Sequence, residues 1–119
     1  MDDPAVPLRR VLIGDFGVVA RMGLRELLAQ EGVEVLGAAE TRGEIFPRLC
    51  EAQPDVVLLD LDTGDSPQLA ARIATDFPAT KVIACSSDRP IMRVFPPFHY
   101  GESYIAPFTR VLFSATIKN

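Results

Sequence analysis

Three acidic or hydroxyl side chains of this sequence stand where an apolar run stops. Asp15, Asp60 and Ser86 each directly follow a short stretch of mostly aliphatic residues. In an open parallel α/β sheet, the carboxyl ends of the strands meet at one edge, where ligands bind. Carboxylates at such an edge can hold a divalent cation, and an aspartate there can also accept a phosphoryl group. The spacing therefore predicts that these side chains share one site.

Alternating strand and helix patterns supply the elements that must position this site. Short aliphatic runs predict four strands, over residues 8–15, 33–38, 55–61 and 81–85. Apolar residues at helical spacing predict one helix that closes at Gly32, one that opens with the capping pair Thr41 and Glu44, and one that opens at Ser66. Strands that alternate with helices of this length form right-handed βαβ units. The predicted fold class is α/β, with a flavodoxin-like, doubly wound parallel sheet.

The composition is that of one ordered domain. The 119 residues, 48% hydrophobic and 24% charged, suffice for a single core, so one domain over 1–119 is expected, with 1–7 as a flexible lead. A net charge of -4 argues against direct contact with nucleic acid. No signal peptide or membrane-spanning run is recognisable, so a cytoplasmic protein is expected. Cys50 and Cys85 form neither a disulfide framework nor a zinc site, and both are expected to be buried and reduced.

Four segments of the sequence resemble a known family. RVLIGD at 10–15, RMGLRELL at 21–28, PDVVLLDL at 54–61 and KVIACS at 81–86 resemble parts of the response-regulator receiver domains of two-component signalling. The matching parts are the first strand, the first helix, the phosphoacceptor strand and the fourth strand. The resemblance is strong as far as Ser87 and weaker beyond, where YIAPFT at 104–109 is similar to the fifth strand and its exit. It implies a five-stranded parallel sheet in the order 2-1-3-4-5.

The resemblance also assigns positions in a metal and phosphoryl site. Asp60 matches the phosphoacceptor aspartate, and Asp15 matches the first of two acids that hold Mg²⁺. Phe16 stands at the second acid, which in the family binds the metal directly, and Asp62 stands where a backbone carbonyl binds it. Mg²⁺ requires hard oxygen ligands, and phosphoryl transfer depends on that cation. Mg²⁺ binding is therefore expected to be weak or absent, and no other cofactor is expected.

Two further positions concern the response to a phosphoryl group. Ser86 matches the hydroxyl residue that senses this group, whereas Ala106 stands where the family carries a lysine. Loss of a charge-assisted hydrogen bond of that kind removes roughly 1.5–3 kcal/mol of stabilisation from an acyl phosphate. The resemblance thus implies an atypical receiver that works without phosphorylation and is not an enzyme.

The segment from Arg89 to Gly101 departs most from the family. It should hold the fourth helix, but Pro96 and Pro97 lack amide donors and restrict the residues before them. We therefore expect that helix to be short, displaced or absent. The aromatic residues of this region are candidates for a homodimer or partner interface over the face from Arg89 to Phe108, although packing over the bare sheet explains any one of them as well. These candidates are Phe95, Phe98, Tyr100, Tyr104 and Phe108.

Three functions remain open from the sequence alone. The first is a phosphorylation-independent regulatory module, in transcriptional control by family analogy, which acts through a protein partner, with a small-molecule ligand as a further option. The second is a working receiver that is phosphorylated on Asp60. The third rests on DLDT at 60–63, which resembles the nucleophile motif of haloacid-dehalogenase-type phosphatases, although no suitable downstream lysine or acidic pair completes it. A C-terminal effector domain could be missing, and the single histidine, His99, builds neither a zinc site nor a triad.

Overall fold

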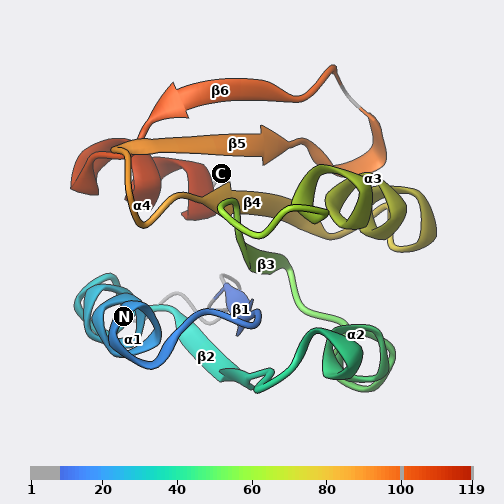
Figure 1. Ribbon diagram of the computed structural model, residues 1–119, viewed down its shortest axis with the longest axis horizontal. Helices are drawn as coiled ribbons and strands as arrows, with labels where there is room; N and C mark the ends of the chain where they lie inside the picture. Colours follow the sequence, from blue (N-terminus) through green and yellow to red (C-terminus); the bar gives the residue numbers. More distant parts are fainter. Residues whose placement is uncertain (1–8, 100, 119) are drawn as a thin grey trace, which may run out of the picture.

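The computed structural model of the chain describes residues 9–99 and 101–118. The expected lead over 1–7 and the interface candidate Tyr100 therefore lie outside the described residues. The strands are β1 Arg10–Ile13, β2 Glu34–Ala38, β3 Val56–Asp60, β4 Lys81–Cys85, β5 Ile91–Phe95 and β6 Tyr104–Pro107. The helices are α1 Val18–Gln30, α2 Ile45–Ala52, α3 Ser66–Asp76 and α4 Arg110–Lys118, with short 3-10 turns η1 Arg42–Glu44 and η2 Pro97–His99. One sheet lies between two helical layers, α1 with α4 and α2 with α3 (Figure 1).

The sheet has the order β2-β1-β3-β4-β5-β6. The first four strands in this order run parallel, whereas β5 pairs antiparallel with both β4 and β6. The flavodoxin-like α/β class and the order 2-1-3-4-5 are confirmed. The expectation of five strands, all parallel, is wrong in two details, because the described residues form six strands and one of them, β5, is antiparallel to its neighbours. The segment expected as the fifth strand is therefore β6.

β5 occupies the place at which the family has its fourth helix. Pro90 and Pro96 bracket the strand, and burial alternates along it, with Met92 and Val94 buried. Proline opposes helix formation, whereas alternate burial is the pattern of a strand that packs one face on a core. The expectation that this helix is displaced or absent is therefore confirmed. Since β5 pairs directly with β4, the strand at 104–107 moves one place farther from the centre of the sheet.

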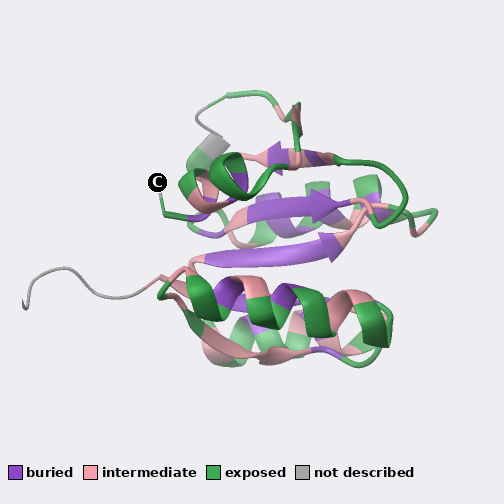
Figure 2. Cartoon of the chain, turned by 90° about the vertical axis from the view of Figure 1, so that its left-hand side faces the viewer, coloured by how far each residue is buried: buried purple, intermediate pink, exposed green. Residues whose placement is uncertain are grey.

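Two apolar cores hold the helices against the sheet. The core beneath α1 and α4 includes Leu28 and Phe113, and the core beneath α2 and α3 includes Leu49 and Ile73. Val56–Leu59 of β3 are buried, as their uninterrupted aliphatic run predicts. Figure 2 shows the buried central strands between helices whose outer sides are exposed. None of the helices in residues 9–99 and 101–118 combines the length and the hydrophobicity that crossing a membrane requires.

Two local details differ from the sequence pattern. Cys85 is buried as expected, but Cys50 is exposed, so the expectation of two buried thiols is wrong. On α2 the buried position is taken by Leu49, and the next residue along a helix points about 100° away. Thr41 and Glu44 do pair through their side chains at 3.2 Å, but the turn η1 intervenes and no side-chain hydrogen bond caps α2.

Candidate functional site at the carboxyl edge of the sheet

Asp15 and Phe16 leave β1 beside the centre of the sheet. Gly14 donates its amide to the Leu58 carbonyl at 2.7 Å, and a Cβ at Gly14 would lie only 2.5 Å from that oxygen. A residue without a Cβ is therefore needed for β1 to pass this close to β3. The side chains of Asp15 and Phe16 lie in different environments. The Asp15 carboxylate contacts the segment after β2, whereas Phe16 is 5% exposed and belongs to the core beneath α1.

Arg42, which the sequence pattern did not single out, lies against the Asp15 carboxylate. Its Nε is 3.5 Å from Asp15 Oδ2 and 3.4 Å from Asp65 Oδ1, and its Nη2 donates to Ser66 Oγ at 3.3 Å. The side chains of Arg42 and Asp15 are 23% and 14% exposed, so water screens this pair only partly. Asp15 Oδ1 and Arg42 Nη1 are buried without a hydrogen-bond partner among the described residues. Arg42 follows shortly after β2, which ends at the same edge of the sheet as β1. This position in the sequence could have identified Arg42 as a site residue.

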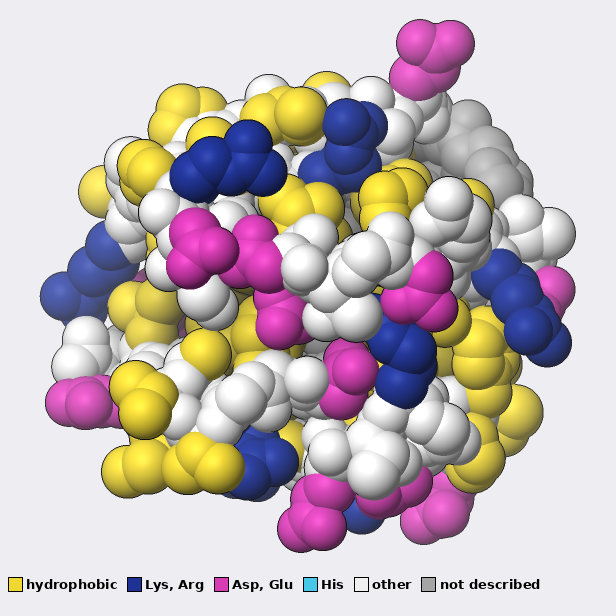
Figure 3. Space-filling model, viewed as in Figure 1, with side chains coloured by type: hydrophobic (Ala, Val, Ile, Leu, Met, Phe, Trp, Pro, Cys, Tyr) yellow, Lys and Arg dark blue, Asp and Glu magenta, His cyan; other side chains and the backbone are white. Residues whose placement is uncertain are grey.

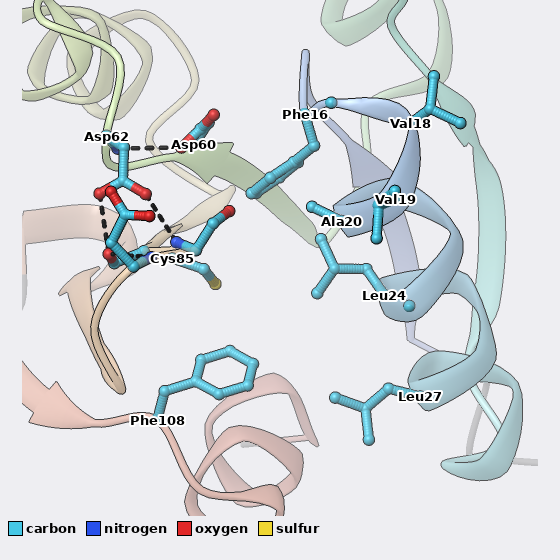
Figure 4. Close-up of a pocket in the computed structure, with 15 residues that line it drawn as sticks. Phe16, Val18, Val19, Ala20, Leu24, Leu27, Asp60, Asp62, Cys85 and Phe108 are labelled. Atoms are coloured by element: carbon cyan, nitrogen blue, oxygen red, sulfur yellow. Dashed lines mark hydrogen bonds between the residues drawn. The ribbon is translucent and has the colours of Figure 1, made fainter.

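Asp60, Asp62 and Ser86 come together in one hydrogen-bonded group (Figure 4). The Asp62 amide donates to Asp60 Oδ1 at 2.9 Å, Ser86 Oγ donates to Asp62 Oδ1 at 2.8 Å, and the Ser87 amide donates to Asp62 Oδ2 at 2.7 Å. The bond from Ser86, followed by that from Ser87, lowers the pKa of Asp62 below its usual 3.8. Ser66 Oγ donates to the backbone carbonyl of Asp60. The Ser86 hydroxyl is thus engaged by Asp62 rather than by Asp60.

The residues at this edge do not fit a magnesium ion. Asp15 is paired with Arg42, and Phe16, at the direct ligand position of the family, is aromatic and buried. Mg²⁺ demands oxygen ligands in near-octahedral geometry. Within the described part of the chain, no group of three or more His, Cys, Asp or Glu side chains could hold a metal ion. The guanidinium of Arg42 supplies positive charge beside Asp15.

Ala106 lies in register with the acidic group but far from it. Asp60, Cys85, Met92 and Ala106 form one row across β3, β4, β5 and β6. At the usual strand spacing of about 4.8 Å, the three steps from Asp60 to Ala106 amount to about 14 Å. The inserted β5 adds one of these steps, so a side chain at position 106 is remote from Asp60.

A groove of about 800 Å³ opens beside the acidic group, between α1 and the exit of β6. Much of its wall is apolar and consists of Phe16, Leu24, Leu27, Cys85 and Phe108 (Figure 4). Asp60 and Asp62 border one end. Burial, followed by the charge of Asp60, raises the pKa of Cys85 to about 12, so this thiol stays uncharged at neutral pH. The volume and the lining are typical of small-molecule sites.

The aromatic candidates for an interface do not form one continuous surface. Phe108 borders the groove, and Phe95 packs against the core beneath α3. Phe98 and Tyr104 are 53% and 49% exposed. Of the four candidates outside Tyr100, two are therefore largely accessible to a partner.

Regulatory proteins of bacteria are similar to this chain over much of its length. The oxygen regulatory protein NreC of Staphylococcus haemolyticus is 35% identical over 78 residues, which are 62% of this chain and 36% of that protein. The uncharacterized transcriptional regulatory protein YhcZ of Bacillus subtilis is 34% identical over 95 residues, 77% of this chain and 44% of that protein. The chain thus spans less than half the length of these two relatives.

A relative of similar size and a solved structure identify the family. The chemotaxis protein CheY of Thermotoga maritima is 32% identical over 81 residues, 66% of this chain and 68% of that protein. The crystal structure of a response regulator from Thermotoga maritima matches with a TM-score of 0.62 and 28% identity, over 68% of each chain. No protein-family model matches the chain. The sequence relatives and the shared fold together show that the chain belongs to the response regulators and forms a receiver domain.

Proposed function

We propose that this receiver domain is a regulatory module in transcriptional control that works without phosphorylation of Asp60. The relative from Bacillus subtilis, described as a transcriptional regulatory protein, supports the process. The observation that carries the proposal is the contact of Arg42 with Asp15 beside the buried Phe16. These three residues leave the edge of the sheet without the pair of carboxylates that holds a metal in the family.

The physical reason concerns charge. Phosphoryl transfer to Asp60 brings an anionic donor toward a carboxylate, and a positioned cation must neutralise the charge that develops. Phe16 contributes no oxygen ligand, and a lysine at the distance of Ala106 would not reach the acidic group. Asp62 and the nearby Asp88 add negative charge to the same edge. The domain is therefore expected to be a poor phosphoacceptor.

One observation favours a second candidate, a working phosphoacceptor. Asp60 borders an open groove, and its Oδ2 accepts no hydrogen bond from the described residues. A small phosphoryl donor could therefore reach it. The phosphatase hypothesis is weaker, because its acid/base would be Asp62, whose lowered pKa opposes proton donation at neutral pH.

Intact-protein mass spectrometry after incubation with acetyl phosphate and Mg²⁺ tests the proposal. We expect no phosphoryl adduct under conditions that modify a receiver with both acids and the lysine. Asp76→Asn, at an exposed acid on α3, controls for modification elsewhere on the chain. An adduct that persists in Asp76→Asn and disappears in Asp60→Asn would make the domain a working receiver.

We further propose that the partner is a protein, with a second copy as the first candidate, bound over the face from Arg89 to Phe108. Support comes from the solvent-exposed Phe98, Tyr104 and Ile105, the last 55% exposed, and from β6 as an edge strand of the sheet. The net charge of -4 supports protein contact over nucleic-acid contact by this domain.

Analytical ultracentrifugation decides between a monomer and a homodimer. We expect a concentration-dependent dimer that Phe98→Glu combined with Tyr104→Glu dissociates, because each glutamate would have to be desolvated at the interface. Val111→Glu is the matched control, since Val111 is 77% exposed on α4, outside this face. A monomer at every concentration tested would refute the homodimer.

A further inference from the structure

The polar contacts between α1 and α4 gather at the carboxyl end of α1. Glu31, just after α1, accepts a hydrogen bond from Ser114 Oγ at 2.5 Å and lies 3.3 Å from Lys118 Nζ and 3.4 Å from Arg110 Nε. Among the described residues, no hydrogen bond or ion pair joins the first turn of α1 to α4. The two helices are therefore held together near Glu31, and the groove opens at the opposite end of α1, next to Asp60.

The long side of the groove is apolar. In Figure 4, Phe16 and Leu27 approach from the α1 side, and Phe108 faces them from the exit of β6. Val18 and Val19 extend this surface to the rim and are 62% and 84% exposed. Leaving so much adjoining apolar surface in water costs free energy that an apolar ligand would recover.

Every charged side chain that lines the groove is acidic. Asp60, Asp62 and Asp88 stand at one end, and neither lysine nor arginine contributes to the lining. Asp60 makes no ion pair within the described residues, in contrast to Asp15 with its Arg42. Figure 3 shows acidic side chains gathered near the centre of this face and hydrophobic side chains at the lower left, where Figure 1 places α1. Acidic groups beside a low-dielectric wall attract cations and repel anions.

We propose that the groove binds a small amphipathic cation, with its apolar body between Phe16, Leu27 and Phe108 and its protonated amine at Asp60 and Asp62. The volume of about 800 Å³ suits a small molecule. An ammonium group donates charge-assisted hydrogen bonds to carboxylates without the octahedral oxygen shell that Mg²⁺ demands. The inference rests on the proposed function, because it names the chemistry of a ligand that a phosphorylation-independent module would sense.

Three probes with eight carbon atoms each and different head groups test the apolar and the cationic part of this proposal. n-Octylamine is a cation at neutral pH, octan-1-ol is neutral, and octanoate is an anion. Titrations followed by two-dimensional ¹H–¹⁵N NMR should show saturable shifts with octylamine at groove residues such as Gly23 and Ser86. Octanol should bind about tenfold more weakly, since it lacks the charge-assisted hydrogen bond, and octanoate should show no saturable binding.

Two variants locate the binding. Gly23 lines the groove on α1, and a Cβ there meets no atom within 4 Å, so Gly23→Leu should fill the groove while it favours the helix. We expect this variant to lose octylamine and octanol alike, whereas Ala29→Leu, at an exposed position of α1 outside the groove, should bind both. The double variant Asp60→Asn with Asp62→Asn should weaken the binding of octylamine about tenfold and leave the binding of octanol unchanged. Unchanged octanol binding would also show that the double variant is folded.

Four results would overturn the inference. These are absence of saturable octylamine binding, equal affinity for octylamine and octanoate, unchanged binding to Gly23→Leu, and a dimer that Gly23→Leu dissociates, which would assign the groove to a second copy. The phosphorylation experiment is independent of these titrations. A phosphoryl adduct on Asp60 would refute the proposed function without removing octylamine binding. If octylamine does not bind and Asp60 stays unphosphorylated, only the proposed ligand is refuted.

Discussion

Replacing Arg42 by methionine removes the cation beside Asp15 and keeps a side chain of comparable length. Two unit charges 3.5 Å apart, the distance from Arg42 Nε to Asp15 Oδ2, attract by about 4–5 kcal/mol at an effective dielectric constant of about 20. Desolvation offsets much of this attraction. Net values run from about 0–1 kcal/mol for exposed pairs to about 3–5 kcal/mol when one partner of a buried pair is removed. With side chains 23% and 14% exposed, this pair lies between the two limits, at about 2 kcal/mol.

Urea and thermal unfolding at pH 7 measure this loss. A loss of about 2 kcal/mol corresponds to a decrease of about 6–8 °C in Tm for a domain of this size. The contact with Asp65 should add little, because that side chain is 64% exposed. Arg48→Met is the matched control. It removes a pair with Glu44 whose side chains are 44% and 39% exposed, so its loss should stay below about 0.5 kcal/mol.

A double-mutant cycle with Asp15→Asn isolates the pair from the other contacts of Arg42. We expect a coupling energy of about 1–2 kcal/mol, because each single variant leaves a partly buried charge without its partner. If Arg42→Met costs no more than Arg48→Met, or if the cycle shows no coupling, Arg42 does not neutralise Asp15 and the central observation of the proposed function fails.

Three further predictions concern pH, thiols and the metal position. The pKa of Glu31 lies below its usual 4.5, mainly because Ser114 donates a hydrogen bond to it and to a smaller extent because of its cationic neighbours. The stabilisation by Glu31 is therefore present above pH 4.5 and is lost as pH falls through the lowered pKa. The free energy of unfolding of Glu31→Gln should converge on that of the wild type in acid, and a difference between the two proteins that does not depend on pH would contradict this. Cys50 should react quickly with a thiol reagent at pH 8, whereas the Cys85 thiol, with a pKa of about 12, should react only on unfolding; two equally fast thiols would be inconsistent with the fold. Phe16→Asp should cost about 3–5 kcal/mol of stability by removing a buried ring, and Mg²⁺ should recover part of that loss through the new carboxylate, as Tm with and without the ion would report; no effect of Mg²⁺ would disprove the recovered site.

Local patterns predicted most of the parallel part of the fold. The aliphatic runs of β3 and β4 lie within a residue of their predicted bounds, because strands covered on both faces must be apolar throughout. The alternation of strands and helices then placed Asp15, Asp60 and Ser86 at one edge, since parallel strands end on the same side of a sheet. The absence of the fourth helix followed in the same way from Pro96 and Pro97.

The sequence by itself thus determined the α/β class, the strand order through β4 and the edge at which the acidic residues meet, because burial patterns and proline act over a few neighbouring residues. Only the tertiary structure decided that residues 91–95 form an antiparallel strand, that the guanidinium of Arg42 lies at Asp15, and that a groove opens beside Asp60. A short apolar segment next to prolines is compatible with a loop, a turn or a strand, and the available edge of β4 selects the strand. Which cation meets which carboxylate, and where a groove opens, depends on contacts between segments far apart in the chain, which no local pattern of residue types encodes.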